Sequence, residues 1–184
     1  MKIRPVHVII AVLAVALVVV LFALRRGEEP QDVKHGTPAQ EDLGPGVRSV
    51  VLTFADRDAL STVDERRDIA VPEDKAGQAK RILEELIRGP EGRDVVGTMP
   101  RGTTVRSVVF DDAGGVFVDF SRELVANHPG GSTGELFTIR SVVRTLSMNF
   151  PEVESVRFLV EGREIETVAG HIDVSGPLPV DQYR

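Results

Sequence analysis

The feature that most constrains this chain is a continuous apolar run near its amino terminus. The run begins at Val6 and ends at Leu24, and His7 is the only polar side chain inside it. At about 1.5 Å of rise per residue, about 19 helical residues span about 28 Å, close to the roughly 30 Å hydrocarbon core of a bilayer. A helix that is apolar on every face is either a membrane span or a deeply buried helix, and the length of this one favours the span. We therefore predict an N-terminal transmembrane signal anchor in residues 1–26.

A cleaved secretory signal peptide is the alternative. Its apolar region usually has about 7–15 residues and ends at a site of small residues. Here the run is longer, and Arg25 and Arg26 follow it directly. Basic residues flank both ends, so the charge rule for orientation is nearly balanced, but the very short amino-terminal tail favours a cytoplasmic amino terminus. We expect a single-pass protein of a bacterial inner membrane, with its remaining residues on the extracytoplasmic side.

Beyond the anchor, the chain is acidic. The whole chain has a net charge of −6, and residues 1–26 hold four basic and no acidic side chains, which leaves −10 for the rest. Nucleic acids repel such a domain, so nucleic acid is not an expected partner. The chain has no cysteine. Disulfides, cysteine nucleophiles and cysteine zinc ligands are therefore excluded.

The composition after the anchor divides the chain into three parts. Residues 27–46 are rich in Pro, Gly and polar residues and poor in apolar ones, which is typical of a flexible linker. Apolar patterning begins near Val47 and continues to about residue 176, so we expect one folded domain over residues 47–176. We expect residues 177–184, with two prolines, to be a C-terminal tail.

Strand and helix patterns alternate along the folded domain. Asp74 is the expected N-cap of a first helix that stops at Gly89, and Ser132 with Glu135 has the spacing of a capping box opening a second helix. Strands are expected at 50–54, 105–110, 116–120, 156–160 and 164–168, with an extended segment and possible strand at 60–71. The order predicts an α+β fold, with two helices packed on one face of a mostly antiparallel sheet.

Seven short motifs, in order, carry a resemblance to a known family. They are 51–54 (VLTF), 65–66 (ER), 86–90 (LIRGP), 99–103 (MPRGT), 118–121 (VDFS), 142–146 (VVRTL) and 156–162 (VRFLVEG). Residues 47–176 thereby resemble the GerMN domain, the sporulation and spore-germination module. The resemblance implies an α/β module of exported, membrane-tethered proteins that is similar in fold to ring-building domains of sporulation machinery and is not known as an enzyme. This chain has one copy and an apolar span, whereas the best-known member has two copies and a lipid anchor.

Five residues are candidate interaction or structural positions: Glu65, Arg66, Asp119, Phe120 and Ser121. Glu65 with the arginines at 66 and 67 is either an ion-pair set for an interface or a strand edge protected by charge, and the edge interpretation is favoured. Asp119 and Ser121 either bind a partner or hydrogen-bond nearby loop backbone beside a core Phe120. The second interpretation is favoured.

Other candidate sites are less complete. The glycine-rich residues 129–134 precede a helix, but they lack the spacing and lysine of a phosphate loop, and the capping box accounts for Ser132 and Glu135. His171 and Asp173, with His128 far away in sequence, provide too few ligands for a metal site. The sequence holds no HExxH motif, and its adjacent acidic residues on one helix do not converge on one substrate. We therefore expect no catalytic residues, metal or cofactor.

These observations predict a non-catalytic interaction module of the cell envelope. It would be held to the membrane through residues 6–24 and would bind itself or other envelope proteins through a sheet edge or a charged helix face. The alternative is an extracytoplasmic domain that binds a small ligand or a cell-wall fragment. A deep apolar pocket with a few convergent polar groups would favour that alternative.

Overall fold

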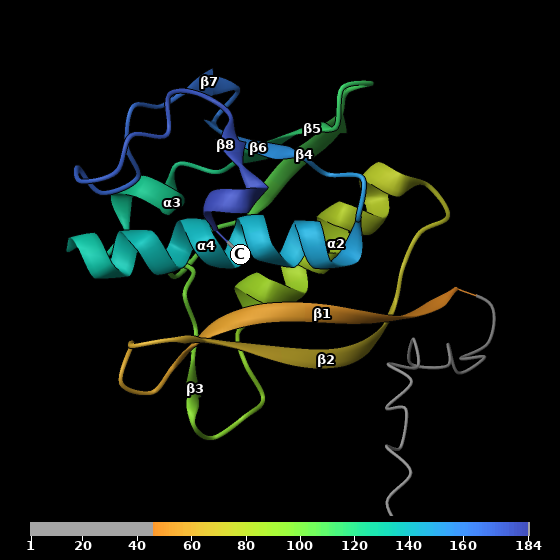
Figure 1. Cartoon of the computed structure of the whole chain (residues 1–184), viewed down its shortest axis with the longest axis horizontal. Coiled ribbons are helices and arrows are strands. Elements are labelled where there is room, and N and C mark those ends of the chain that lie inside the picture. The colour runs from red at the N-terminus through yellow and green to blue at the C-terminus, as the bar shows by residue number, and fades with distance from the viewer. Residues whose placement is uncertain (1–45, 184) are drawn as a thin grey trace, which may run out of the picture. The chain divides into compact units, whose positions relative to one another are not determined.

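A computed structural model describes residues 46–183, and these residues have an α+β fold (Figure 1). The elements are β1 (Val47–Asp56), β2 (Thr62–Ala70), α2 (Lys75–Arg88), β3 (Val95–Val96), β4 (Val105–Phe110), β5 (Gly115–Phe120), α3 (Glu123–Ala126), α4 (Ser132–Asn149), β6 (Ser155–Val160), β7 (Arg163–Glu164), β8 (Leu178–Pro179) and the 3-10 helix η1 (Val180–Gln182). The predicted anchor and nearly all of the predicted linker lie outside the described residues. Within residues 46–183, no helix is both long and apolar enough to span a bilayer.

The strands form two sheets. One has the order β2-β1-β3, and the other has the order β4-β5-β6-β7, with β8 also pairing with β6. The helices α2 and α4 lie between the two sheets, and α2 contacts both β1 and β4 (Figure 1). The prediction of one sheet with helices on one face is therefore wrong. Strand patterns along a sequence show which side chains are buried, but they do not show which strands pair.

The pairing within the sheets is mostly antiparallel, as predicted. The exception is β5 with β6, which run parallel from the pair Gly115–Ser155 to the pair Phe120–Val160. Parallel neighbours need a long crossover connection, and α4 provides it. Because α4 lies between the sheets, many of its side chains are buried, polar ones included.

Both edges of β1 are covered. One edge pairs with β2, from Val47 opposite Ala70 to Ala55 opposite Thr62. On the other edge, Asn149 of α4 behaves like a peptide group. Its Oδ1 accepts the Val51 N–H at 3.0 Å, and its Nδ2 donates to the Val51 carbonyl at 2.7 Å. Covering an edge with a helix removes a site at which foreign strands would pair.

The predicted ends of the first helix are confirmed, but the capping box of the second is wrong. The Asp74 carboxylate accepts the Gly77 N–H at 2.6 Å, and Gly89, with φ of 98°, ends α2. At α4 the N-cap is Gly131, and no side chain caps the N–H groups of the first turn. Glu135 does not reach back to the start of its own helix, because its carboxylate is bonded to a loop near the carboxyl terminus.

The folded domain extends beyond the expected boundary at residue 176. Pro179 of β8 lies opposite Ser155 of β6, and Val180 and Tyr183 are buried. Residues 178–183, which we expected to be part of a tail, therefore pack on the core. Proline is tolerated here because β8 is a short edge strand. The strand expected at 164–168 is reduced to the two residues of β7.

Candidate functional site

The outer edge of β2 is the first candidate interaction surface. In an antiparallel pair, opposite residues alternate between those that exchange both backbone hydrogen bonds and those whose N–H and C=O groups point away. Both backbone groups of Val51 bond to Asn149, so Val51 and its partner Arg66 form a pair of the second kind. The backbone groups of Arg66, and of Asp64 and Asp68 on either side, therefore point outward from β2. Within residues 46–183 no strand pairs with these outward groups.

The side chains of Asp64, Arg66 and Asp68 share one face of β2 and are exposed. Asp64 is already engaged. Its carboxylate lies 3.1 Å from Nε and 2.7 Å from Nη2 of Arg144, and it accepts a hydrogen bond from the Thr53 hydroxyl at 2.8 Å. The bond from Arg144 is the main reason that the pKa of Asp64 lies below its usual value. In the described part of the chain, Arg66 and Asp68 make no such ion pair.

Beneath β2, on the inner face of its sheet, lies a cluster of buried ionic side chains. Arg67 is 8% exposed, and its Nη1 lies 3.1 Å from Oε2 of Glu85 on α2, which is 1% exposed. The same carboxylate lies 2.6 Å from Nη2 of Arg81 and 3.0 Å from Nη1 of Arg88. Three guanidinium groups thus meet one buried carboxylate, and the contact from Arg67 anchors β2 to α2.

Glu65 completes this cluster and holds the loop after α2. Its carboxylate accepts hydrogen bonds from Arg67 and from the N–H groups of Glu91 and Gly92, the last two at 3.1 and 3.2 Å. Burial opposes ionisation of Glu65, but these bonds outweigh burial and hold its pKa below the usual value. Glu65 therefore points inward and its neighbour Arg66 outward, so the two candidates act on opposite faces of one edge strand.

The other three candidates lie at the end of β5, in the other sheet. Phe120 is fully buried, with its ring centroid 5.5 Å from that of Phe158. The carboxylate of Asp119 accepts the Gly162 N–H at 2.7 Å. The hydroxyl of Ser121 accepts the Thr104 N–H at 3.0 Å. These contacts agree with the favoured interpretation of a core phenylalanine flanked by loop-bonding polar side chains. The structure does not bring these residues together with Glu65 and Arg66.

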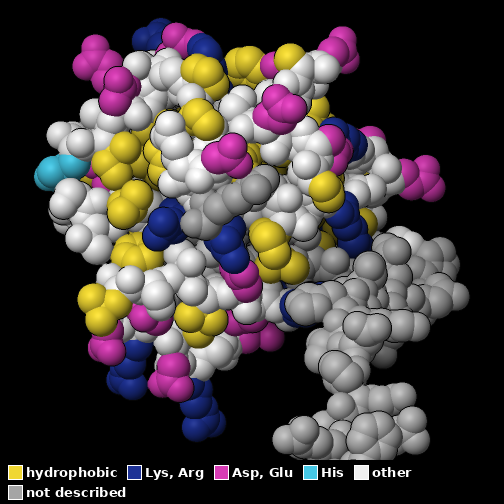
Figure 2. Space-filling view, viewed as in Figure 1, with side chains coloured by type: hydrophobic (Ala, Val, Ile, Leu, Met, Phe, Trp, Pro, Cys, Tyr) yellow, Lys and Arg dark blue, Asp and Glu magenta, His cyan; other side chains and the backbone are white. Residues whose placement is uncertain are grey.

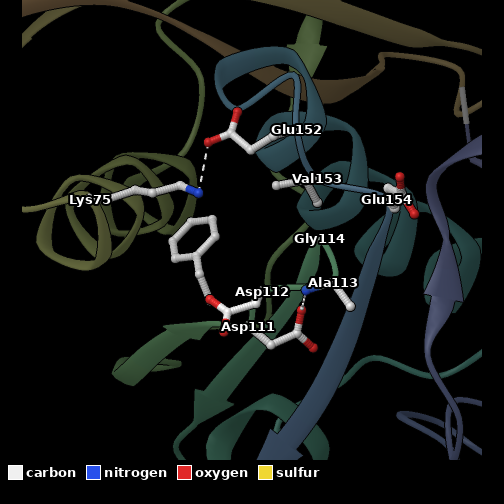
Figure 3. Close-up of a pocket in the computed structure, with 9 residues that line it drawn as sticks. Lys75, Asp111, Asp112, Ala113, Gly114, Glu152, Val153 and Glu154 are labelled. Atoms are coloured by element: carbon white, nitrogen blue, oxygen red, sulfur yellow. Dashed lines mark hydrogen bonds and ion pairs between the residues drawn. The ribbon is translucent and has the colours of Figure 1, made fainter.

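A cleft of about 380 Å³ opens beside the β4–β5 turn (Figure 3). Lys75 and Glu152 point toward one another across it, with Nζ 2.7 Å from Oε1, and the same Nζ lies 3.9 Å from the centroid of the Phe110 ring. The Asp111 carboxylate closes the turn by accepting the Ala113 N–H at 2.9 Å. Three of the charged side chains that line the cleft, Lys75, Glu152 and Asp111, are thus already paired, and the cleft lacks the apolar walls typical of small-ligand sites.

Glu135 ties the carboxyl-terminal loop to α4. Its side chain is fully buried, and its carboxylate accepts the N–H groups of Val168, Ala169 and His171 at 2.9, 2.8 and 2.8 Å. Burial opposes ionisation, but these backbone bonds outweigh it and hold the pKa of Glu135 below its usual value. Sequence reasoning missed this role because the bonded loop lies more than thirty residues away.

The two histidines in the described part of the chain make separate contacts. His171 Nδ1 lies 3.2 Å from the Glu135 carboxylate, and His128 Nε2 lies 3.1 Å from the Thr138 hydroxyl. Asp173, which sequence spacing paired with His171, bonds to Ser175 instead. Over residues 46–183, no group of three potential metal ligands converges.

The fold has known relatives. The family model Germane, described as sporulation and spore germination, matches residues 36–166. The first GerMN domain of the sporulation protein GerM from Bacillus subtilis is 23% identical, with a TM-score of 0.56 over 72% of this chain and 97% of that one. The tandem GerMN domains of the same protein are 22% identical, with a TM-score of 0.55 over 72% of this chain and 44% of that one.

A third solved structure, from Clostridium perfringens, is provisionally assigned as a lipoprotein. It is 21% identical, with a TM-score of 0.53 over 74% of this chain and 90% of that one. No curated protein matches the sequence. At these identities the structural likeness shows the fold alone, whereas the match to the family model relates the sequence itself to the family.

Proposed function

We propose, on the premise that this chain belongs to the Germane family of sporulation and spore-germination domains, that it is a membrane-tethered, extracytoplasmic interaction module of the bacterial cell envelope. The observation that carries the proposal is the family match over residues 36–166, which includes α2, α4 and most of both sheets. This family is a sporulation and germination family and not a known class of enzymes.

The amino-terminal sequence supports tethering. The apolar run from Val6 to Leu24 has the length of a membrane span. About 20 residues of Pro- and Gly-rich linker would give the domain a reach of about 25 Å. The similar protein from Clostridium perfringens, provisionally a lipoprotein, is consistent with a membrane-held domain of this fold.

The surface of the described residues supports binding through polar and backbone groups. Acidic and basic side chains are intermixed over the face seen in Figure 2. The large exposed apolar side chains are spread over several elements: Val47, Leu60, Val96, Val109, Val125 and Met148. Apolar residues scattered in this way are ordinary for a soluble surface. The outer edge of β2, with its outward backbone groups, is the surface that best fits a protein partner.

The test is in-vivo crosslinking of the tagged full chain in bacterial membranes, followed by pull-down and mass spectrometry. We expect crosslinked species that contain a second copy or another envelope protein. A matched control is a membrane protein with the same residues 1–46 fused to an unrelated domain, which should not recover these species. Recovery of the uncrosslinked monomer alone, at crosslinker doses that join known membrane complexes, would overturn the proposal.

A further inference from the structure

We propose that β2 pairs, edge to edge and antiparallel, with β2 of a second copy of this chain. The two β2-β1-β3 sheets would then join into one continuous sheet. This inference rests on the proposed function, because it names the surface and the partner through which the domain would assemble. The free edge of β2 and the charges along it point to a second copy as the occupant.

The β2 edge differs from the other edges in residues 46–183. The far edge of β1 is sealed by Asn149, and β3 has only two residues. In the other sheet, the edge strand β4 is interrupted by a register shift between Val105 and Ser107, and the Arg106 carbonyl accepts a bond from Lys80. β2 has nine residues in unbroken register with β1. It therefore offers the longest regular ladder to an incoming strand.

The charge pattern of β2 is complementary to itself in one register. With a two-fold axis at Arg67, Arg66 lies opposite the partner's Asp68, and Asp68 lies opposite the partner's Arg66. The backbone groups of Arg66 and Asp68 both point outward, so these positions would exchange both backbone hydrogen bonds across the interface. Opposite charges directly across an antiparallel pair stabilise the pairing.

The neighbouring registers fit less well. A shift that places Arg66 opposite the partner's Arg66 brings like charges together and sets Asp64 against the partner's Asp68. A further shift in the same direction places Asp64 opposite the partner's Arg66, but the Asp64 carboxylate is already bonded to Arg144 and Thr53. A shift in the other direction sets Asp68 against the partner's Asp68. The register centred on Arg67 uses the two charged side chains of this face that make no ion pair within the described residues.

The strand is also held in place before any partner arrives. Arg144 fixes Asp64 on one face of β2, and Glu85 fixes Arg67 on the other. A preordered strand loses little conformational entropy on pairing. An edge-to-edge contact buries less area than a standard interface, so the association in dilute solution should be weak. Tethering both copies to one membrane would raise their effective concentration.

Charge exchange in the full chain tests the inference. Two differently tagged copies are expressed in bacterial membranes, and their association is measured by energy transfer between fluorescent proteins at the carboxyl termini. Arg66→Asp alone, or Asp68→Arg alone, places like charges across the axis and should weaken association about tenfold. The double variant Arg66→Asp/Asp68→Arg should restore it. Arg163→Asp, a matched reversal on exposed β7, should change nothing.

Single reversals that leave association unchanged, or a double variant that fails to recover it while remaining folded by circular dichroism, would overturn the inference. The chain has no cysteine, so introduced thiols give a second, independent measurement. A copy with Arg66→Cys should crosslink to a copy with Asp68→Cys more efficiently than two Arg66→Cys copies crosslink to each other. Copies with Asp112→Cys, exposed in the β4–β5 turn of the other sheet, should not crosslink. If the Arg66→Cys and Asp68→Cys pair gave the same yield as two Arg66→Cys copies, that result would also overturn the inference.

The results separate this inference from the proposed function. If the β2 variants leave association unchanged while pull-down recovers another envelope protein, the β2 pairing is wrong and the proposed function stands. If crosslinking recovers no partner of any kind, both are wrong.

Discussion

At the scale of single residues, buried and partly buried carboxylates connect parts of this domain that are distant in sequence. Glu135 on α4 accepts three backbone N–H groups from the loop before β8, and Glu65 on β2 accepts two from the loop after α2. Asp119 does the same for the turn at Gly162. Loops without regular secondary structure leave backbone N–H groups without partners. Each carboxylate accepts hydrogen bonds from such groups.

We predict that Glu135→Gln destabilises the domain by about 2–4 kcal/mol, because an amide cannot accept all three N–H bonds and leaves a buried donor unpaired. The measurement is urea unfolding of the purified full chain, followed by circular dichroism. Glu154→Gln, a matched change on an exposed residue, should have little effect. Equal stability of the two variants would contradict the structural role of Glu135.

The same carboxylate predicts a pH dependence. The pKa of folded Glu135 lies below the ordinary value of 4.5, so its ionised form stabilises the fold. That contribution is complete above about pH 4.5 and is lost as the pH falls through the lower pKa of the folded state. Unfolding free energies measured from pH 7 downward should therefore fall less steeply for Glu135→Gln than for the natural chain. Parallel pH profiles would contradict this assignment.

At the scale of elements, α4 seals the edge of β1 with polar side chains. Asn149 bonds both backbone groups of Val51, and the Thr145 hydroxyl accepts the Thr53 N–H at 3.0 Å. These side chains lie four residues apart, on one face of the helix. β2 has no such cover among the described residues, and this difference between two neighbouring strands directs the proposed pairing to β2.

Asn149→Ala should destabilise the fold by about 2 kcal/mol, because it leaves the Val51 N–H and carbonyl groups without partners. Met148→Ala, next to it on the exposed side of α4, is the control and should be near neutral. Thermal unfolding of the full chain measures both. If Asn149→Ala were as stable as Met148→Ala, Asn149 would not be what seals the β1 edge.

The elements also show how far sequence patterns reach. α2 begins after Asp74 and ends at Gly89, as predicted, because capping depends on residues within one turn. The alternation that buries Val118 and Phe120 is equally local. The division into two sheets depends on contacts between distant segments. Sequence patterns place Arg67 on a solvated edge because charged residues are seldom buried, and only the fold shows that Glu85 lies beside it.

At the scale of the whole molecule, membership of the Germane family and an amino-terminal apolar run point to one arrangement. The run would hold the chain in the membrane, the linker would give the domain reach, and β2 would present a free edge at one side. An acidic domain is repelled by anionic lipid headgroups, so we expect it to stand away from the bilayer, where a second domain can approach.

The most direct test of this arrangement is a membrane-impermeant amine crosslinker, applied to intact spheroplasts that carry the tagged full chain. The domain holds Lys75 and Lys80, and both would be accessible from outside. We predict that intact spheroplasts give crosslinked species larger than the single chain, and that their yield equals the yield after lysis. A chain that reacts only after lysis, or that stays monomeric in both conditions, would contradict this arrangement.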